Sequence, residues 1–345
     1  MNRCNVKRAC GLGFLLAAAM LAACGKDAAP DAQAPPAPPE VAAESAPEIT
    51  PDMTVPDSGV AAVALAKWTG DLDGMIQRRY IRVLTTYSRT HFFIDQGVQR
   101  GLVPDAFKLF EDDLNKRLKN KHLRVQVVFV PVAHDELVPA LLEGRGDIVA
   151  AGTLISDWRR EQVDFTNPTR TGVAVIPITG PGTTPLTGIA DLAGREIYQR
   201  DSTAPKRVVE RFNADLAKMG KPPARVRPAP AVLADEDILE MVAAGLVSMT
   251  LAEDYVAEFW QQVFPGLVLH PAAAVSTDAV TGMMVRKGSP QLLAELNAFL
   301  TRYPEGSLTR NVLLQKYLKS VKYAKPATSE ADMKRFRDVI DLMRK

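Results

Sequence analysis

The chain has 345 residues, and its 42 Lys and Arg against 40 Asp and Glu leave a formal net charge of +2. This length predicts one large or two medium domains. The balanced charge gives no reason to expect a nucleic-acid partner, and no basic stripe interleaved with aromatic residues occurs.

The first 23 residues are typical of a secretory signal peptide. Basic residues precede an apolar run over 11–23, which is short for a membrane span. The run ends in Leu21–Gly25, which resembles a bacterial lipobox, and this implies that Cys24 becomes the acylated first residue of the mature chain. An ordinary signal peptide with a chance cysteine is the alternative. Because Gly25 replaces the aspartate that retains lipoproteins in the inner membrane, we expect the periplasmic face of the outer membrane.

A tether is expected next, over 24–67. Residues 26–60 are mostly Pro, Ala and acidic residues, which cannot bury enough apolar surface to offset the entropy of ordering. The three cysteines all lie within the first 24 residues, so we expect no disulfide in the folded part.

Two α/β units follow the tether. In the first, patterns predict strands over 80–85, 123–129 and 148–151 and helices over 104–119 and 135–143. In the second, they predict strands over 195–199, 247–251 and 281–286, and helices that begin at Ser202 or Thr203 and near 238, 255 and 290. This alternation favours mostly parallel sheets flanked by helices. The loop 179–185 is a candidate hinge.

The stretch 144–168 carries the main functional signal. It predicts a buried strand, a polar turn and then Arg159 at the start of a helical turn, where a guanidinium is well placed to hold a carboxylate. A surface ion pair with Asp157 or Asp164 is the alternative role for Arg159. The pattern Gly-x-x-Asp-x-x-Ala-x-Gly, Ile-Ser-x-x-Arg and Val-Asp-Phe-Thr-x-Pro resembles the signature of family 3 bacterial extracellular solute-binding proteins.

That resemblance implies a periplasmic-binding-protein-like fold with two lobes, two crossings between them and a ligand cleft. We therefore expect a first lobe over 68–178, a second lobe over 179–271 and a return to the first lobe over 272–320. Residues 321–345 would form a helix or linker.

The resemblance also implies ligand-binding positions, carried over residue by residue. The expected set is Thr86, Tyr87, Arg89, Phe92, Arg159, Arg200, Ser202, Thr203, Glu253 and Asp254. Arg159 would hold the carboxylate, and Glu253 or Asp254 would pair with an amine. Helix capping is the alternative for Thr203, and a favourable helix N-terminus is the alternative for Glu253.

Three positions depart from amino-acid binders of the family. Thr86 stands where an acid is usual, Arg89 where an aromatic residue is usual and Leu154 where a hydroxyl is usual. A bulkier or more anionic ligand than a free α-amino acid is therefore expected.

A second resemblance covers about residue 68 to the end. The runs 198–203, 239–246, 253–260 and 311–318 resemble the N-terminal module of membrane-bound lytic murein transglycosylase F. The printed sequence stops at Lys345, where the catalytic domain of that family would begin. We therefore expect no enzyme activity from these residues themselves.

Three functions follow as hypotheses. The first is a lipid-anchored periplasmic module that closes on a carboxylate-bearing ligand, such as a peptidoglycan fragment or peptide. The second is a lytic transglycosylase cut before its catalytic domain, and the third is an amino-acid-binding protein that serves an ABC permease. No motif for a metal or cofactor occurs, and the four histidines are scattered.

Overall fold

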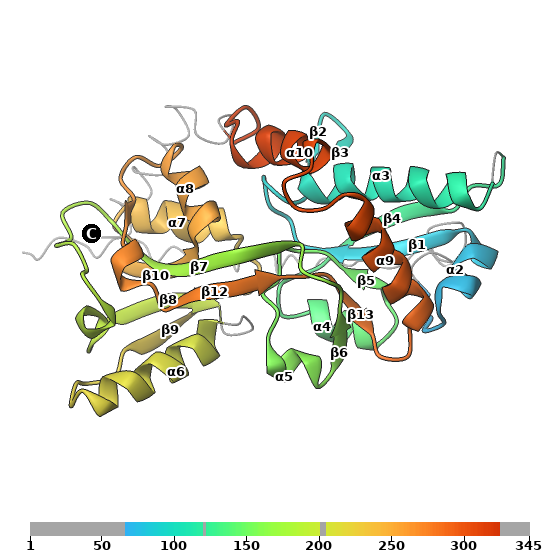
Figure 1. Ribbon diagram of the computed structural model, residues 1–345. Coiled ribbons are helices and arrows are strands. Elements are labelled where there is room, and N and C mark those ends of the chain that lie inside the picture. Colours follow the sequence, from blue (N-terminus) through green and yellow to red (C-terminus); the bar gives the residue numbers. More distant parts are fainter. Residues whose placement is uncertain (1–65, 120–121, 201–204, 325–345) are drawn as a thin grey trace, which may run out of the picture. The chain divides into compact units, whose positions relative to one another are not determined.

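The computed structural model describes residues 66–119, 122–200 and 205–324 (Figure 1). The expected signal peptide, Cys24, nearly all of the tether, Ser202, Thr203 and the expected C-terminal helix lie outside these ranges. Within them, no helix has the length and apolar character needed to cross a bilayer.

The first sheet has five strands in the order β4-β1-β5-β13-β6. Strand β1 runs parallel to β4 and β5, whereas β13 runs antiparallel to β5 and β6. The strands are β1 (Tyr80–Thr85), β4 (Gln126–Pro131), β5 (Ile148–Val149), β6 (Val163–Phe165) and β13 (Met284–Arg286).

Helices cover both faces of this sheet, because alternate residues of a strand point to opposite faces. Ile81 and Val83 of β1 pack with residues of α2, α3 and α9, whereas Leu84 packs with α4 on the other face. The helices are α2 (Leu72–Arg78), α3 (Leu102–Arg117), α4 (Leu137–Leu142) and α9 (Pro290–Arg302). We call this sheet and its helices the first lobe.

The second sheet is centred on β7 (Arg170–Thr179), which pairs antiparallel with β10, β11 and β12. The parallel pair β8–β9 joins its edge, where the Thr250 hydroxyl on β10 donates to the Tyr198 carbonyl on β8 at 2.8 Å. These strands are β8 (Glu196–Arg200), β9 (Arg225–Ala229), β10 (Met249–Glu253), β11 (Val268–Leu269) and β12 (Ser276–Thr281). The sheets are thus mixed, and the expected parallel pairing does not hold around β7.

Two helices lie on one face of the second sheet and one lies on the other (Figure 1). The upper helices are α7 (Asp235–Ala243) and α8 (Asp254–Gln261), and the lower one is α6 (Pro205–Lys218). Short 3-10 turns occupy Ile189–Leu192 and Pro271–Ala273. We call this sheet and its helices the second lobe.

The chain crosses between the lobes twice, just before β7 and just after β12. The two crossings are bonded together, since the Thr169 amide donates to the Thr281 carbonyl at 2.7 Å and their hydroxyls lie 2.9 Å apart. We propose that the lobes divide at Thr169 and Gly282. The expected divisions at 178/179 and 271/272 are set aside because β7 and β12 both pair within the second sheet. The loop 179–185, expected as a hinge, follows the end of β7.

Two further elements complete the first lobe. The hairpin of β2 (Phe93–Asp95) and β3 (Val98–Arg100) precedes α3, and α10 (Leu308–Leu318) follows α9. Tyr317 of α10 packs edge-on against Phe93, with ring centres 6.3 Å apart. Its hydroxyl donates to Asp105 on α3 at 2.9 Å, so α10 is fixed to both the hairpin and α3.

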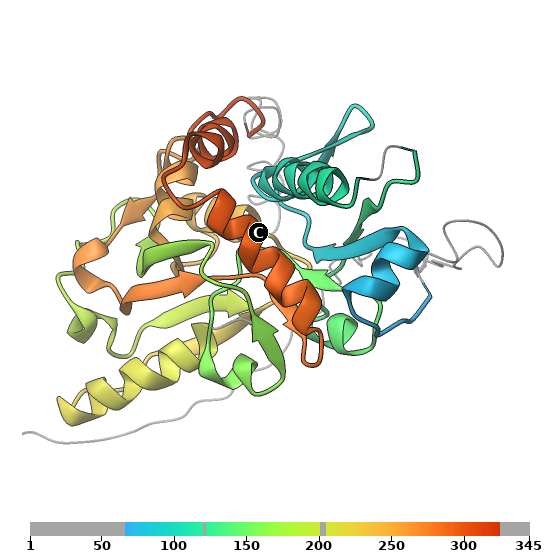
Figure 2. The same ribbon diagram turned by 45° about the vertical axis from the view of Figure 1, so that its right-hand side comes forward.

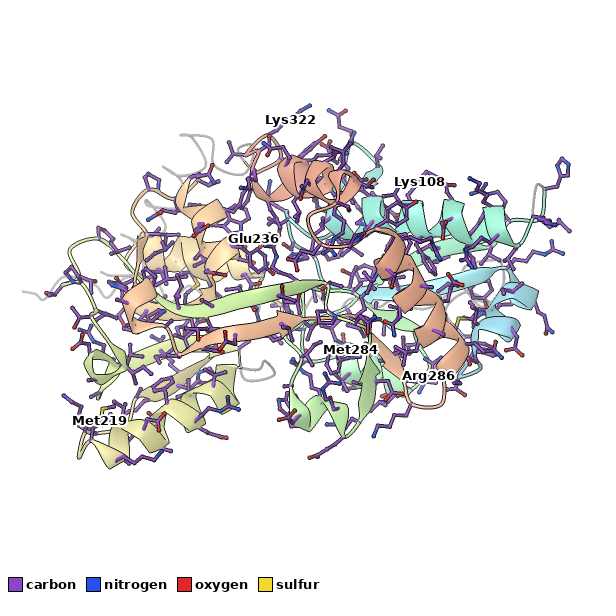
Figure 3. The ribbon with its side chains drawn as sticks, in the orientation of Figure 1. Lys108, Met219, Glu236, Met284, Arg286 and Lys322 are labelled. Carbon is purple, nitrogen blue, oxygen red and sulfur yellow. The ribbon has the colours of Figure 1, made fainter. Side chains whose placement is uncertain are left out.

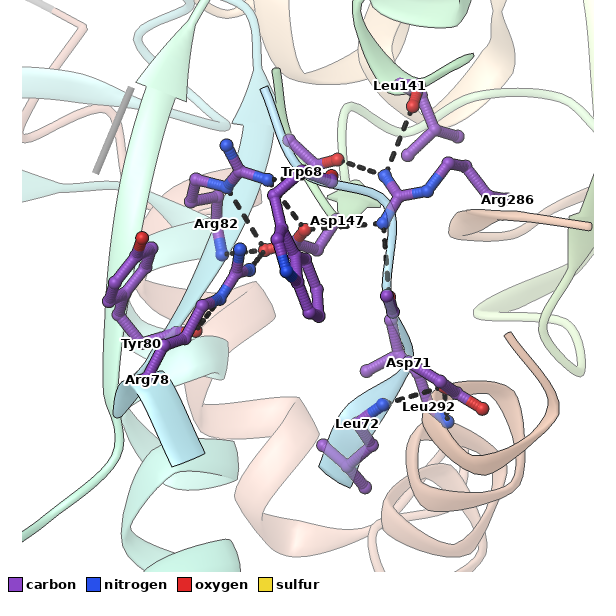
Figure 4. Close-up of polar contacts among 12 residues, drawn as sticks. Trp68, Asp71, Leu72, Arg78, Tyr80, Arg82, Leu141, Asp147, Arg286 and Leu292 are labelled. Atoms are coloured by element: carbon purple, nitrogen blue, oxygen red, sulfur yellow. Dashed lines mark hydrogen bonds and ion pairs between the residues drawn. The ribbon is translucent and has the colours of Figure 1, made fainter. Parts of the chain in front are cut away.

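A buried charge cluster ties the start of the described chain to the first sheet (Figure 4). Asp147 is fully buried and accepts hydrogen bonds from the Arg82 amide at 2.8 Å and from the Arg82 guanidinium at 3.0 Å. Arg78 and Arg286 also pair with it. The Arg82 guanidinium in turn donates to the Trp68 carbonyl at 3.1 Å. Asp147 therefore acts as a structural anchor, which accounts for this part of the sequence motif without any ligand.

Candidate functional site

A polar cavity lies between the two lobes, where loops follow their strands. Residues of both lobes line it, among them Arg159 of the first lobe and Arg200 of the second. Its polar lining consists of His91, His134, Thr153, Arg159, Gln199, Arg200, Asp235, Glu253 and Tyr255. We call this cavity the cleft. It encloses about 70 Å³, which gives room for the end of a ligand and not for a whole sugar–peptide unit.

Arg159 lies in α5 (Asp157–Arg160), a single turn after β5. Its side chain is only 6% exposed, and its Nη1 donates to the Leu154 carbonyl at 3.1 Å. Burial lowers the pKa of Arg159 to about 10, against the opposing effect of the Glu253 carboxylate. The group remains a cation at neutral pH. A buried cation of this kind is stabilised when a carboxylate enters the same cavity.

Arg200 ends β8 and reaches the cleft with its charge already balanced in part. It pairs with Asp235 at the start of α7 and donates to the Leu233 carbonyl at 2.7 Å. Burial would raise the pKa of Asp235, but the charge of Arg200 and its hydrogen bond hold this pKa well below the usual range. Because Asp235 stays ionised, part of the Arg200 charge is already balanced within the protein.

Glu253 ends β10 and faces the cleft at the N-terminus of α8. Burial and the nearby Asp235 raise the pKa of Glu253 to about 7. It therefore binds a proton more readily near neutral pH than an exposed glutamate does. A ligand amine beside it would favour the ionised form.

Two histidines line the cleft as neutral groups. Burial lowers the pKa of His134 to about 4, with Arg200 adding to the effect, and burial also lowers the pKa of His91. His91 Nδ1 forms a hydrogen bond with the Thr90 hydroxyl at 3.0 Å, and the His91 tautomer determines which of the two atoms donates. Neutral rings of this type can bond a ligand without adding charge.

The structure brings Arg159, Arg200 and Glu253 together in the cleft, as a set. The other predicted residues that it describes do not line the cavity. Phe92 is 1% exposed and packs between Tyr87 and Phe129, with ring centres 5.5 and 5.6 Å away. Tyr87 is 55% exposed.

Three more predicted positions lie close to the cleft without lining it. Thr86 is buried. The Asp254 carboxylate accepts a hydrogen bond from the Tyr255 amide at 2.8 Å. Arg89 acts through its backbone, because its amide donates to Glu236 on α7 at 2.6 Å. Ser88 donates to the same carboxylate at 3.2 Å. Glu236 therefore links the two lobes directly; its place on α7 is marked in Figure 3.

Sequence reasoning missed His91, His134, Gln199, Asp235 and Tyr255. Asp235 carried one usable signal, since an acidic residue at a helix start is well placed to meet a cation near that end of the sheet. The histidines carried none, because they reach the cleft from separate loops. Among the described residues, no group of three or more His, Cys, Asp or Glu side chains is arranged to hold a metal ion.

The sequence model for bacterial extracellular solute-binding proteins, family 3, matches residues 81–320. The chain belongs to this family. The match covers both lobes and the elements that build the cleft, so the family's two-lobed fold agrees with the observed architecture.

Curated relatives share sequence with most of the folded part of this chain. Membrane-bound lytic murein transglycosylase F from Desulfosudis oleivorans is 26% identical over 235 residues, which are 68% of this chain and 48% of the relative. The protein of the same name from Pseudomonas fluorescens is 28% identical over 236 residues, or 67% and 44%. The chain thus spans about half the length of these curated relatives.

Solved structures of similar fold include holo ArgBP from T. maritima, at 20% identity and a TM-score of 0.54, which covers 71% of this chain and 99% of that one. A putative L-cystine ABC transporter protein from Listeria monocytogenes is 17% identical with a TM-score of 0.58, and covers 70% and 97%. At these identities the likeness shows the fold alone.

Proposed function

We propose that the protein is a solute-binding module that closes its two lobes on a carboxylate-bearing ligand. The ligand proposed is a peptidoglycan fragment or a peptide. The observation that carries this proposal is the buried cation Arg159, which shares one cavity with Glu253. Arg159 suits a carboxylate and Glu253 suits an amine. The cleft holds only the end of a ligand, so a terminal residue of a peptide fits these groups.

Two features favour a cell-wall ligand over a nutrient amino acid. Two curated relatives that match about two thirds of the chain are named membrane-bound lytic murein transglycosylase F. Thr86, Arg89 and Leu154 also depart from the pattern of amino-acid binders. In this proposal the module lies in the periplasm, is held to the outer membrane by lipid on Cys24, and regulates murein turnover by an attached or separate transglycosylase domain.

Closure can regulate a partner only if the ligand binds the closed form more tightly than the open form. Glu236 supplies a contact that depends on how the lobes are placed. Its carboxylate on the second lobe accepts hydrogen bonds from Arg89 and Ser88 on the first, so separating the lobes would break them.

Delivery of an amino acid to an ABC permease is the second candidate. Glu253 favours it, because an acid beside Arg159 matches a ligand that carries both an amine and a carboxylate. A lytic transglycosylase that includes this chain is the third. Clearing of purified murein sacculi by this chain alone would support that enzyme.

Isothermal titration calorimetry tests the proposal, with peptidoglycan stem peptides and free amino acids as two ligand panels. We expect stem peptides to bind more tightly than free amino acids. Preference for a free amino acid would instead support the transport function, and binding to neither panel would contradict both.

A further inference from the structure

A second cavity lies beside the cleft, between α3, α9 and α10, and we call it the α3–α10 slot. It encloses about 150 Å³. His91, Gly152 and Tyr255 line both the slot and the cleft, so the two cavities are adjacent. Figure 2 shows α9 and α10 following one another along the chain, near α3.

The walls of the slot are apolar. Phe107, Phe110 and Phe299 form buried parts of the wall. Other apolar side chains in the wall keep part of their surface exposed, and these are Leu102, Ala106, Leu109, Leu300, Leu313 and Leu314. An unfilled apolar space loses the dispersion contacts that packing would supply. An engineered apolar cavity of about 150 Å³ binds benzene, so this slot has room for a ring or a short alkyl chain.

Two arginines, Arg170 and Arg310, also line the slot, and the charge of Arg170 acts on Arg310. The guanidinium of Arg170 lies 4.1 Å from the centre of the Tyr255 ring, and Arg310 donates to the Thr169 carbonyl. Burial lowers the pKa of Arg310, and the charge of Arg170 lowers it further.

In the described part of the chain, neither arginine forms an ion pair with a carboxylate. Glu305 lies near enough to act on Arg310 by charge, but it accepts hydrogen bonds from the Thr171 amide at 3.1 Å and hydroxyl at 2.9 Å. Two interacting cations in the wall of an apolar space are complementary to an anion that carries an apolar body.

We propose that the α3–α10 slot binds a small amphiphilic carboxylate, with the carboxylate against Arg170 and Arg310 and the alkyl chain or ring in the slot. This site uses different charged residues from the cleft, so it goes beyond the function proposed above and is tested separately from it.

Calorimetry with straight-chain carboxylates from propionate to octanoate tests the proposal. Burying each added CH₂ contributes about 0.8 kcal/mol to the binding free energy. Affinity therefore rises about fourfold per carbon until the slot is full. Hexanol binds at least about tenfold more weakly than hexanoate, since it lacks the charge. Affinity that does not depend on chain length, or equal binding of hexanol and hexanoate, overturns the proposal.

A matched pair of variants locates the site on α3. Ala106→Trp fills the slot and abolishes the dependence on chain length, whereas Lys108→Trp, on the exposed side of the same helix (Figure 3), leaves it unchanged. Retention of the dependence in folded Ala106→Trp overturns the proposal.

If circular dichroism shows that Ala106→Trp is unfolded, Arg310→Gln takes its place. It should reduce the preference for hexanoate over hexanol, and an unchanged preference overturns the proposal. Stem-peptide binding, measured on the same samples, reports on the cleft independently, so failure of one proposal is distinguished from failure of the other.

Discussion

The Asp147 cluster gives the sharpest prediction for stability. In Asp147→Asn, the charge that balances Arg78, Arg82 and Arg286 is removed from a site that water does not reach (Figure 4). Hydrogen bonds to charged groups contribute about 1.5–3 kcal/mol each and do not add simply. Breaking a buried ion pair from one side costs about 3–5 kcal/mol. We expect a loss in this range, because at least one buried guanidinium is left without a charge partner.

For a domain of this size, about 1 kcal/mol lowers the melting temperature by roughly 2–4 °C, so Asp147→Asn should lower it by roughly 6–20 °C. Differential scanning calorimetry measures this. The matched control is Asp112→Asn, which removes an exposed carboxylate paired with Arg124 and should cost about 0–1 kcal/mol. Hydrogen exchange should show lost protection in β1 and β5 before the second lobe. Equal melting temperatures for Asp147→Asn and Asp112→Asn would show that the buried Asp147 charge stabilises the fold no more than an exposed carboxylate does.

Two predictions concern the cleft and the anchor. Because burial raises the pKa of Glu253 to about 7 in the folded protein from its ordinary value of 4.5, the unfolded chain ionises first, and this group's contribution to stability falls as pH rises through that window. The melting temperature of Glu253→Gln should therefore rise relative to that of wild type as pH increases from about 5 to 7. Glu258→Gln, which changes an exposed residue of α8, should show the same pH dependence as wild type. A pH-independent difference between Glu253→Gln and wild type would contradict the raised pKa of Glu253. For the anchor, Cys24→Ala should move the protein from the membrane to the soluble periplasmic fraction, and unchanged fractionation would rule out lipid on Cys24 as the means of attachment.

Arg159 could be predicted from the sequence because its signal is local. The strand, the turn and the helical turn that place it follow one another within 144–168, with no long-range contact needed. The same holds for the alternation of helices and strands, since apolar periodicity is a local property. The helix over 290–302 was found with its bounds as observed.

The rest of the site depends on contacts between distant segments. Arg200 was predicted as a ligand-binding position and lines the cleft, but its pairing with Asp235, 35 residues later, could not be predicted. Nothing in either local pattern shows that a β-strand end and a helix start will meet. His91 and His134 reach the cleft from two different loops of the first lobe, and their roles were invisible for the same reason.

The proposed crossings between the lobes differ from the expected ones for a local reason. The expected strand over 281–286 divides at Gly282 into β12 and β13, which belong to different sheets. A Cβ at Gly282 would lie 2.9 Å from Ile155 Cδ1, so a larger residue there would require the Ile155 side chain to move. Apolar patterning cannot distinguish a continuous strand from two strands that meet at such a point.

Calorimetry on variants of two adjacent arginines tests whether Arg159 binds the ligand. Arg159→Gln removes a buried cation, whereas Arg160→Gln removes an exposed one from the same turn. Charge-assisted hydrogen bonds contribute about 1.5–3 kcal/mol, so the affinity of Arg159→Gln for a stem peptide should fall about 10- to 100-fold. Arg160→Gln should bind like wild type. Wild-type affinity in folded Arg159→Gln would contradict a role for Arg159 in binding the ligand carboxylate.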